Sequence, residues 1–282
     1  MSFLDRIREI NRHDLSAYMD FVVDGCVLGR VRRDRVAILL KSSPLLRRGK
    51  GETIEFQADL TTVEARSAGM AAAAATLEAA GHIPALRAEL YPATWNFGDP
   101  PRFAIDRAAV PFFGLRAWGV HMNGYTWKNG HLHMWIGRRA DDKPTYPGML
   151  DNMVAGGQPT GVGLMENLIK ECAEEADIPA DLARQAQSVG AITYVQEAPE
   201  GLKPDVQFCF DLELPPDFMP RNTDGEIADF FLWPIEKVAK TVATTRSFKF
   251  NCNLVIIDFL IRHGVIPPDD RDYVALVQGL HP

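Results

Sequence analysis

Residues Gly156 to Ile178 read GGQPTGVGLMENLIKECAEEADI, and no other part of the 282-residue chain is as informative. The glycines permit a tight loop whose backbone groups turn toward a ligand. The residues that follow, from about Val162, are typical of a helix. On this helix Glu171, Glu174 and Glu175 are spaced i, i+3 and i+4, which confines them to roughly 100° of arc. The segment therefore predicts a glycine loop and a helix that gathers three carboxylates.

An apolar stripe on the same helix is separate from the carboxylates, and it consists of Met165, Ile169, Cys172 and Ala176. The helix can therefore pack against a sheet while it presents the glutamates sideways. Clustered carboxylates repel one another unless a cation neutralises them. Hard oxygen ligands suit magnesium, with manganese as the alternative, and both ions also take phosphate oxygens from a substrate. The competing interpretation is an ordinary solvated helix face.

The glycines and the run Lys170-Glu171-Cys172-Ala173-Glu174-Glu175-Ala176-Asp177-Ile178 resemble the signature box of the Nudix (MutT-like) hydrolases. In that family the loop–helix–loop binds divalent metals, and a water cleaves a diphosphate joined to another group. The resemblance implies that Glu171, Glu174 and Glu175 bind Mg²⁺, or Mn²⁺, with help from a backbone carbonyl near Gly156. It also implies that Gly156 and Gly157 border the substrate.

This box departs from the family pattern at four places. Lys170 replaces an arginine, Val162 a glutamate and Asp177 a glycine, and the glycine loop is one residue short. Lysine keeps the positive charge but loses the bidentate fork of arginine. Valine removes a supporting carboxylate and leaves the central trio intact. A ligand-sensing module that has lost turnover is therefore the competitor to an active hydrolase.

The flanks resemble one Nudix subgroup, which carries an additional N-terminal domain and is related to proteins fused to thiamine pyrophosphokinase in some fungi. The resemblance rests on Arg138-Arg139, Lys143, the run from Pro147 to Gly157, Glu89-Leu90-Tyr91 and Phe112-Phe113-Gly114. It implies removal of phosphate from thiamine diphosphate, or from its oxidised and damaged forms, to give the monophosphate. One fold hosts many specificities, so another diphosphate such as ADP-ribose is the alternative substrate.

Further candidates surround this segment. Arg138, Arg139 and Lys143 could hold the phosphates of the substrate through charge-assisted hydrogen bonds, or they could be solvated charges at a strand end. Glu226 follows a predicted turn, and the family often recruits a later glutamate as a base or an extra ligand. Glu226 is our candidate for that role, with Glu213 as a weaker one and an ordinary polar turn residue as the competing interpretation.

Histidines and tryptophans give weaker signals. His131 and His133 are two residues apart on a predicted strand, and with His121 they suggest zinc, but no third ligand has sensible spacing. Three tryptophans could stack an aromatic ligand, although large aromatics usually fill cores: Trp95, Trp118 and Trp127.

The fold class that we expect is α+β. Residues 1–110 form a small N-terminal α+β domain, with a hairpin at Asp24-Gly25, a strand near residues 53–56 and a helix capped by Thr61. We expect residues 91–101 to be a loop. Residues 111–282 form a Nudix-type α/β/α sandwich with a mixed sheet. Its predicted elements are strands at 119–127, 131–137, 206–214 and 230–233 and a strongly apolar helix near the end of the chain, at 254–263.

The composition argues against several classes of function. A net charge of −7 argues against non-specific nucleic-acid binding, and no apolar run approaches the roughly 20 residues that span a bilayer. The four cysteines show no paired spacing and are typical of reduced thiols. The N-terminus lacks the apolar core of a secretory signal. We expect a cytoplasmic enzyme with a small-molecule diphosphate substrate and no nucleic-acid or membrane partner, and a homodimer is compatible with the sequence.

Overall fold

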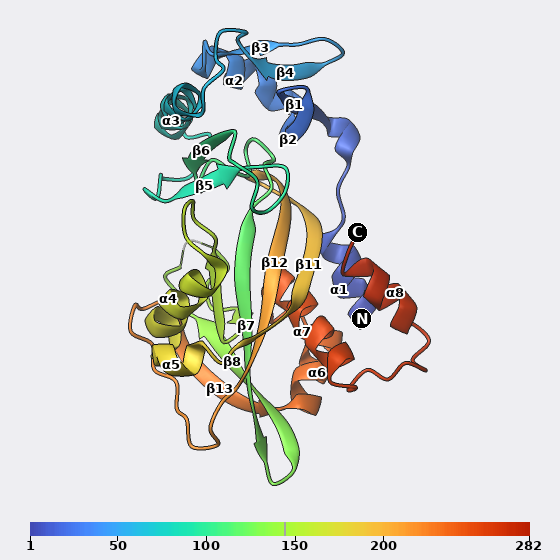
Figure 1. Cartoon of the computed structure of the whole chain (residues 1–282). Coiled ribbons are helices and arrows are strands. Elements are labelled where there is room, and N and C mark those ends of the chain that lie inside the picture. The colour runs from blue at the N-terminus through green and yellow to red at the C-terminus, as the bar shows by residue number, and fades with distance from the viewer. Residues whose placement is uncertain (144) are drawn as a thin grey trace.

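A seven-stranded mixed sheet dominates the computed structural model, which describes residues 1–143 and 145–282 (Figure 1). Its main path runs β11-β12-β7-β8-β13. The bounds are Gln187–Ala198 for β11, Gly201–Glu213 for β12, Trp118–Lys128 for β7, His131–Arg139 for β8 and Ile227–Pro234 for β13. Strand β12 runs parallel to β7, and the other pairs on this path are antiparallel. The prediction of a mixed sheet is confirmed.

Strands β7 and β8 pair only near their shared hairpin, from Tyr125 to Lys128 on β7. Beyond that point they separate, and two short strands pair with their inner edges. Strand β9 (Leu150–Asp151) pairs with β8, and β10 (Val154–Gly157) pairs with β7. The glycine segment of the sequence is therefore held inside the split between two long strands.

Helices cover both faces of the sheet. Side chains alternate along β7, so Val120 packs with Leu168 and Cys172 of α4 (Leu164–Ala176), while His121 contacts α7 (Phe250–Arg262) on the opposite face. The short α5 (Ala180–Ala183) packs against α4, and α6 (Ile235–Thr244) packs against α7. These three layers make the expected α/β/α sandwich.

A second core lies in the N-terminal part, among buried residues between Met19 and Leu115 such as Phe21 and Phe103. Its four-stranded sheet has the order β2-β1-β4-β3, and β5 and β6 form a separate pair. The strands are β1 (Tyr18–Val23), β2 (Cys26–Arg32), β3 (Leu46–Arg48), β4 (Thr53–Phe56), β5 (Leu90–Ala93) and β6 (Phe103–Asp106). The helices are α2 (Val36–Ser42), α3 (Val63–Ala79) and the short 3₁₀ turns Leu15–Ala17 and Arg33–Arg35.

The first helix, α1 (Phe3–Ile10), does not belong to the N-terminal core. Its buried Ile7 and Ile10 join the core around α7, and α1 packs beside α7 and α8 (Tyr273–Gly279). The chain thus begins in the C-terminal layer, leaves it to form the second core, and returns. The division at residues 110/111 stays a prediction.

Several local predictions can be compared directly with the structure. The hairpin is confirmed, since Asp24 and Gly25 both have positive φ, as the turn requires. The helix cap is Thr62 rather than Thr61, because the Thr62 hydroxyl accepts from the Ala65 N–H. Residues 91–93 belong to β5, so the loop prediction for 91–101 was wrong there. The helix predicted at 254–263 is α7, which begins at Phe250 rather than Leu254, and α8 follows it. No helix in the described residues is long and apolar enough to cross a membrane.

Candidate active site

Gly156 and Gly157 lie at the end of strand β10, so the prediction that they form a tight loop was wrong. Neither has a positive φ, and the bend comes later, at Gly161 with φ +81°. Their small size serves close approach instead. A Cβ on Gly156 would lie 2.4 Å from Cδ of Glu171, and a Cβ on Gly157 would lie 1.4 Å from Oη of Tyr91. The two glycines let an acid and a phenol lie directly against the strand.

Glu175 is the most deeply buried of the three glutamates, with 3% of its surface exposed. Its carboxylate accepts a hydrogen bond from the Ala155 N–H at 2.8 Å. Burial raises the pKa of Glu175 well above its usual value, and the charges of Asp151, Glu171 and Glu226 raise it further. In the described residues no basic side chain pairs with it. A buried acid without a counter-charge is the feature that a divalent cation would stabilise.

Glu171 and Glu174 share the ammonium group of Lys170. Nζ of Lys170 lies 3.2 Å from Oε1 of Glu171 and 2.7 Å from Oε2 of Glu174. The side chain of Glu171 is 14% exposed, and burial raises its pKa despite Lys170. The carboxylates of the trio line one side of α4 but do not converge on a point. Among the described residues, only a different group brings three candidate ligand atoms within 4.8 Å of one another.

The donor set nevertheless fits a hard divalent ion. Three carboxylates and the carbonyl of Gly156 supply oxygen ligands, and among the described residues Lys170 alone pairs with the trio, at Glu171 and Glu174. Glu171 already lies against Gly156, so its carboxylate and the backbone of β10 lie side by side. Rotation of the half-exposed Glu174 side chain away from Lys170 would add a further carboxylate to these oxygen ligands. The residues present therefore fit a bound divalent cation.

Glu226 lies near the trio, although it comes from a turn far along the chain. Its backbone carbonyl accepts from the Ala140 N–H at 3.0 Å, and its carboxylate pairs with Nζ of Lys143 at 2.7 Å. Its charge contributes to the raised pKa of Glu175, behind the larger effect of burial. The structure thus brings Glu226 and Lys143 together beside the acids. Their roles in catalysis and phosphate binding stay predictions.

Arg138 and Arg139 point to acids of their own. Arg138 pairs with Asp141 and Asp229, each at 2.9 Å. Arg139 is buried and pairs with Asp151 at 3.0 Å. Both guanidinium groups are thus held by carboxylates in this arrangement, whereas Lys143 has a single acidic partner at the site. The predicted phosphate contacts of the two arginines remain untested.

Comparison with known proteins decides the family. Residues 2–117 match a domain of unknown function (DUF4743). Nudix hydrolase 20, chloroplastic, of Arabidopsis thaliana is 40% identical over 288 residues, which cover 99% of this chain and 77% of that protein. Nudix hydrolase 24, chloroplastic, of the same plant is 40% identical over 281 residues, with the same coverage. This chain belongs to the Nudix hydrolase family.

Solved Nudix structures show a lower similarity to this chain. The NUDIX domain of Shewanella oneidensis NrtR, solved with ADP ribose, is 14% identical, covers 54% of this chain and 90% of its own, and has a TM-score of 0.43. A MutT protein from Methanosarcina mazei is 16% identical, covers 52% of this chain and 95% of its own, and has a TM-score of 0.41. The family assignment rests on the plant relatives. Nudix hydrolases act on diphosphate linkages and use divalent metal ions.

One departure from the Nudix box has a structural reason. Asp177 caps the end of α4 in the left-handed region, with φ 54°, where the family pattern has glycine. Aspartate tolerates this conformation better than most residues, and here its carboxylate also pairs with Arg221. The helix therefore ends at the position that a glycine would give. The backbone carrying the three glutamates is preserved.

The N-terminal part supplies residues that the sequence did not single out as site residues. The Thr160 N–H of the Nudix loop donates to the Leu90 carbonyl of β5 at 2.8 Å. Next to it, Tyr91 covers Gly157, and Glu89 pairs with Arg107. The charge of Glu89 is a minor contributor to the raised pKa of Glu171, after burial. Only the resemblance to the subgroup marked Glu89-Leu90-Tyr91, and nothing marked Arg107.

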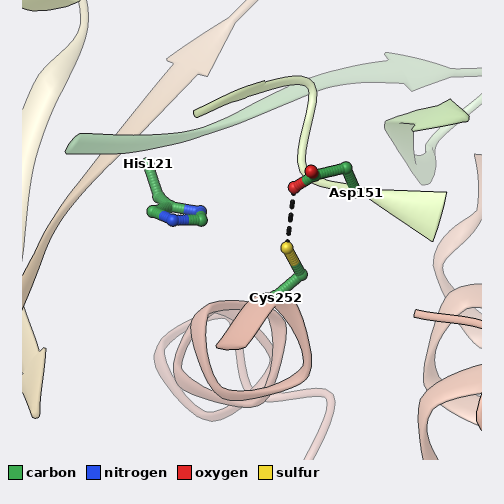
Figure 2. A group of neighbouring side chains, drawn as sticks. All are labelled: His121, Asp151 and Cys252. Atoms are coloured by element: carbon green, nitrogen blue, oxygen red, sulfur yellow. Dashed lines mark hydrogen bonds between the residues drawn. The ribbon is translucent and has the colours of Figure 1, made fainter. Parts of the chain in front are cut away.

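A buried polar cluster lies on the α7 face, formed by His121, Asp151 and Cys252 (Figure 2). The thiol of Cys252 donates to Asp151 at 2.7 Å. Arg139 and Lys249 lie 3.0 and 3.3 Å from the same carboxylate. Although burial opposes ionisation, these cations lower the pKa of Asp151 to about 2. Two cations already neutralise this acid, so the cluster does not suit a metal ion.

His121 in this cluster is held in its neutral form. Its Nδ1 lies 2.9 Å from Oδ1 of Asn152, and its Nε2 lies 3.3 Å from Nδ2 of Asn251. Burial, reinforced by the charge of Lys249, lowers the pKa of His121 to about 4. His131 and His133 lie elsewhere, near the β7–β8 turn, where His133 Nδ1 is 3.0 Å from the His131 carbonyl. The three histidines do not form one site.

Proposed function

We propose that this Nudix hydrolase removes a phosphate from thiamine diphosphate, or from its oxidised and damaged analogues, to give the monophosphate. The observation that carries the hydrolytic part is the buried carboxylate of Glu175, hydrogen-bonded to Ala155 and close to Glu171. The thiamine part rests on the subgroup resemblance of Glu89-Leu90-Tyr91 and Phe112-Phe113-Gly114. In the structure, the first of these motifs borders the Nudix loop.

Magnesium is the ion that we propose for the site. Glu171, Glu174, Glu175 and the Gly156 carbonyl would hold it. When bound, such an ion supplies neutralisation of the diphosphate oxygens and a lower pKa for a bound water. The hydrogen bond from Ala155 fixes the orientation of Glu175, so this acid needs little rearrangement.

Glu226 is the proposed proton acceptor. Its carboxylate is 39% exposed and has one partner, Lys143, whose ammonium group can move to a phosphate oxygen as substrate binds. That exchange would free the carboxylate to take a proton from the attacking water. The lysine would then neutralise charge on the phosphate. Loss of Glu226 should lower kcat more than it changes KM, whereas loss of Lys143 should also raise KM.

A substrate panel tests this function. Phosphate release in Mg²⁺ would be measured for thiamine diphosphate, oxidised thiamine diphosphate and ADP-ribose. We expect a thiamine compound to have the highest kcat/KM. A preference for ADP-ribose by orders of magnitude would refute the thiamine assignment but not the hydrolase. Binding without any phosphate release would instead support the sensing module.

Matched variants test the residues. Glu175→Gln keeps the acceptor for Ala155 and removes the charge, so we expect kcat to fall about 100-fold or more, equivalent to about 2.7 kcal/mol. Glu226→Gln should also reduce kcat. Glu213→Gln, an exposed glutamate at the end of β12, is the control and should retain activity. Equal losses in all three variants would contradict the assignment of Glu226.

A further inference from the structure

A cavity of about 160 Å³ lies where the N-terminal part meets the Nudix loop. One side is formed by the segment after β5, including Thr94 and Phe97. The other side is formed by Trp118, at the start of β7, and by residues 158–162 of the Nudix loop. Figure 1 shows β5 and β6 beyond the end of the sheet at which β7 begins. The cavity therefore needs both parts of the chain.

Two buried polar atoms without partners in the described part of the chain belong to residues that line the cavity. Thr94 is 5% exposed and Trp118 is 6% exposed, and both line the cavity. In the described residues, Oγ1 of Thr94 and Nε1 of Trp118 have no hydrogen-bond partner. Leaving such an atom unpaired costs about 1–3 kcal/mol, so these two atoms indicate a missing polar partner.

Aromatic side chains form part of the cavity wall. Phe97 is 41% exposed, and its ring meets Trp118 edge-on at a centroid distance of 5.3 Å. Phe97 also meets Phe208 at 4.7 Å, and Trp118 stacks on Phe208 at 6.2 Å. An exposed phenylalanine beside the buried Trp118 and the partly buried Phe208 offers a flat apolar surface to a ligand. Asp99 adds a carboxylate to the lining, which favours a ring with positive charge.

Strand register places the cavity beside the catalytic acids. Val120 of β7 pairs with Gly156, the glycine that lies against Glu171. Trp118 is two residues earlier on the same strand and so projects from the same face, at roughly 7 Å along the strand. The Gln158 N–H donates to the Trp118 carbonyl at 2.9 Å, which fixes this relation.

We infer that this cavity binds the heteroaromatic ring of the diphosphate substrate. The inference rests on the proposed function and names the subsite for the organic half. A cavity of about 150 Å³ accommodates one six-membered ring. The indole N–H of Trp118 donates to a ring nitrogen, the Thr94 hydroxyl bonds to a ring substituent, and Phe97 covers the ring face. A substrate without a ring would leave these polar atoms unpaired.

Kinetics with and without the ring test the inference. The kcat/KM ratio of thiamine diphosphate to methyl diphosphate would be measured for the wild type, Phe97→Ala and Thr94→Val. We expect each variant to lower the ratio at least tenfold. Trp127→Ala is the control, because Trp127 is an exposed aromatic near the far end of β7, and it should leave the ratio unchanged. An unchanged ratio in both cavity variants overturns the inference and leaves the hydrolase function intact.

Binding of the product, thiamine monophosphate, tests the ring subsite independently of hydrolysis. Equilibrium binding of thiamine monophosphate would be measured without metal, for the same four proteins. We expect at least tenfold weaker binding to Phe97→Ala and Thr94→Val than to the wild type. If the wild type binds this ligand and both variants lose it, while thiamine diphosphate is not hydrolysed, the proposed function fails and the subsite stands. If the wild type does not bind thiamine monophosphate, the inference fails.

Discussion

Asp151 and Glu175 are two buried acids beside the same short strands, and their surroundings differ. Asp151 on β9 pairs with Arg139 and Lys249, which lower its pKa to about 2 although burial opposes this. Glu175 on α4 accepts one backbone N–H, and burial raises its pKa well above the usual value. The contrast teaches that burial alone does not mark a functional acid. The missing counter-charge distinguishes an acid that can bind a metal from one that stabilises the fold.

The largest effect that we expect from this contrast is on stability. Asp151→Asn should lower the free energy of unfolding by about 3–5 kcal/mol, because Arg139 and Lys249 lose their buried partner. Glu175→Gln should cost nothing or stabilise the metal-free protein, since it removes an unpaired buried charge. Urea unfolding of both metal-free variants at pH 7 compares them. Similar losses in both would remove the distinction between the two acids.

The neighbouring His121 should produce a slightly smaller effect that depends on pH. Its pKa is lowered from 6.5 to about 4, so above pH 6.5 it is neutral in both states and contributes nothing. As the pH falls from 6.5 to about 4, only the unfolded chain takes up the proton. The free energy of unfolding should then fall by about 1.4 kcal/mol per pH unit, or about 3 kcal/mol in total.

Two variants isolate the contribution of His121 to the pH dependence of the free energy of unfolding. Glu175→Gln is the background, because an acid with a raised pKa gains stability as the pH falls and would mask the effect. Urea unfolding at pH 7, 6 and 5 would compare this background with Glu175→Gln/His121→Asn. The second variant should show the flatter dependence. Parallel curves would mean that His121 is not held neutral.

A smaller effect is expected at the end of the Nudix helix. Asp177→Gly should stabilise the protein by up to about 1 kcal/mol, because glycine adopts the left-handed conformation without strain. Part of this gain is offset by loss of the exposed ion pair with Arg221, which contributes about 0–1 kcal/mol. Thermal unfolding in the Arg221→Gln background removes that offset. A loss of stability there would show that Asp177 has another role.

Patterns that depend on local spacing could be predicted from the sequence. The spacing of Glu171, Glu174 and Glu175 gave the acidic side of α4, and alternation gave the long strands of the mixed sheet. Gly156 and Gly157 were recognised but assigned the wrong geometry, because glycine fits a turn and a close approach equally well. Only the three-dimensional structure shows that these glycines allow a close approach of other side chains.

Contacts between distant segments could not be predicted. The pairing of Arg139 with Asp151 depends on the split between β7 and β8, and no spacing reveals it. The approach of Glu89 and Tyr91 to the Nudix loop requires the arrangement of the two cores. Trp118 was considered as a stacking surface, but its partners Phe97 and Phe208 come from other parts of the chain. Such neighbours depend on tertiary packing rather than on local pattern.

Titration with Mn²⁺, followed by electron paramagnetic resonance, tests the contrast between the two acids most directly. The proteins would be the wild type, Glu175→Gln and Cys252→Ser, where serine keeps the hydrogen bond to Asp151. The account predicts at least tenfold weaker Mn²⁺ binding to Glu175→Gln and unchanged binding to Cys252→Ser. Unchanged Mn²⁺ binding to Glu175→Gln, with weaker binding to Cys252→Ser, would place the metal at Asp151 instead of Glu175. That result would contradict the account.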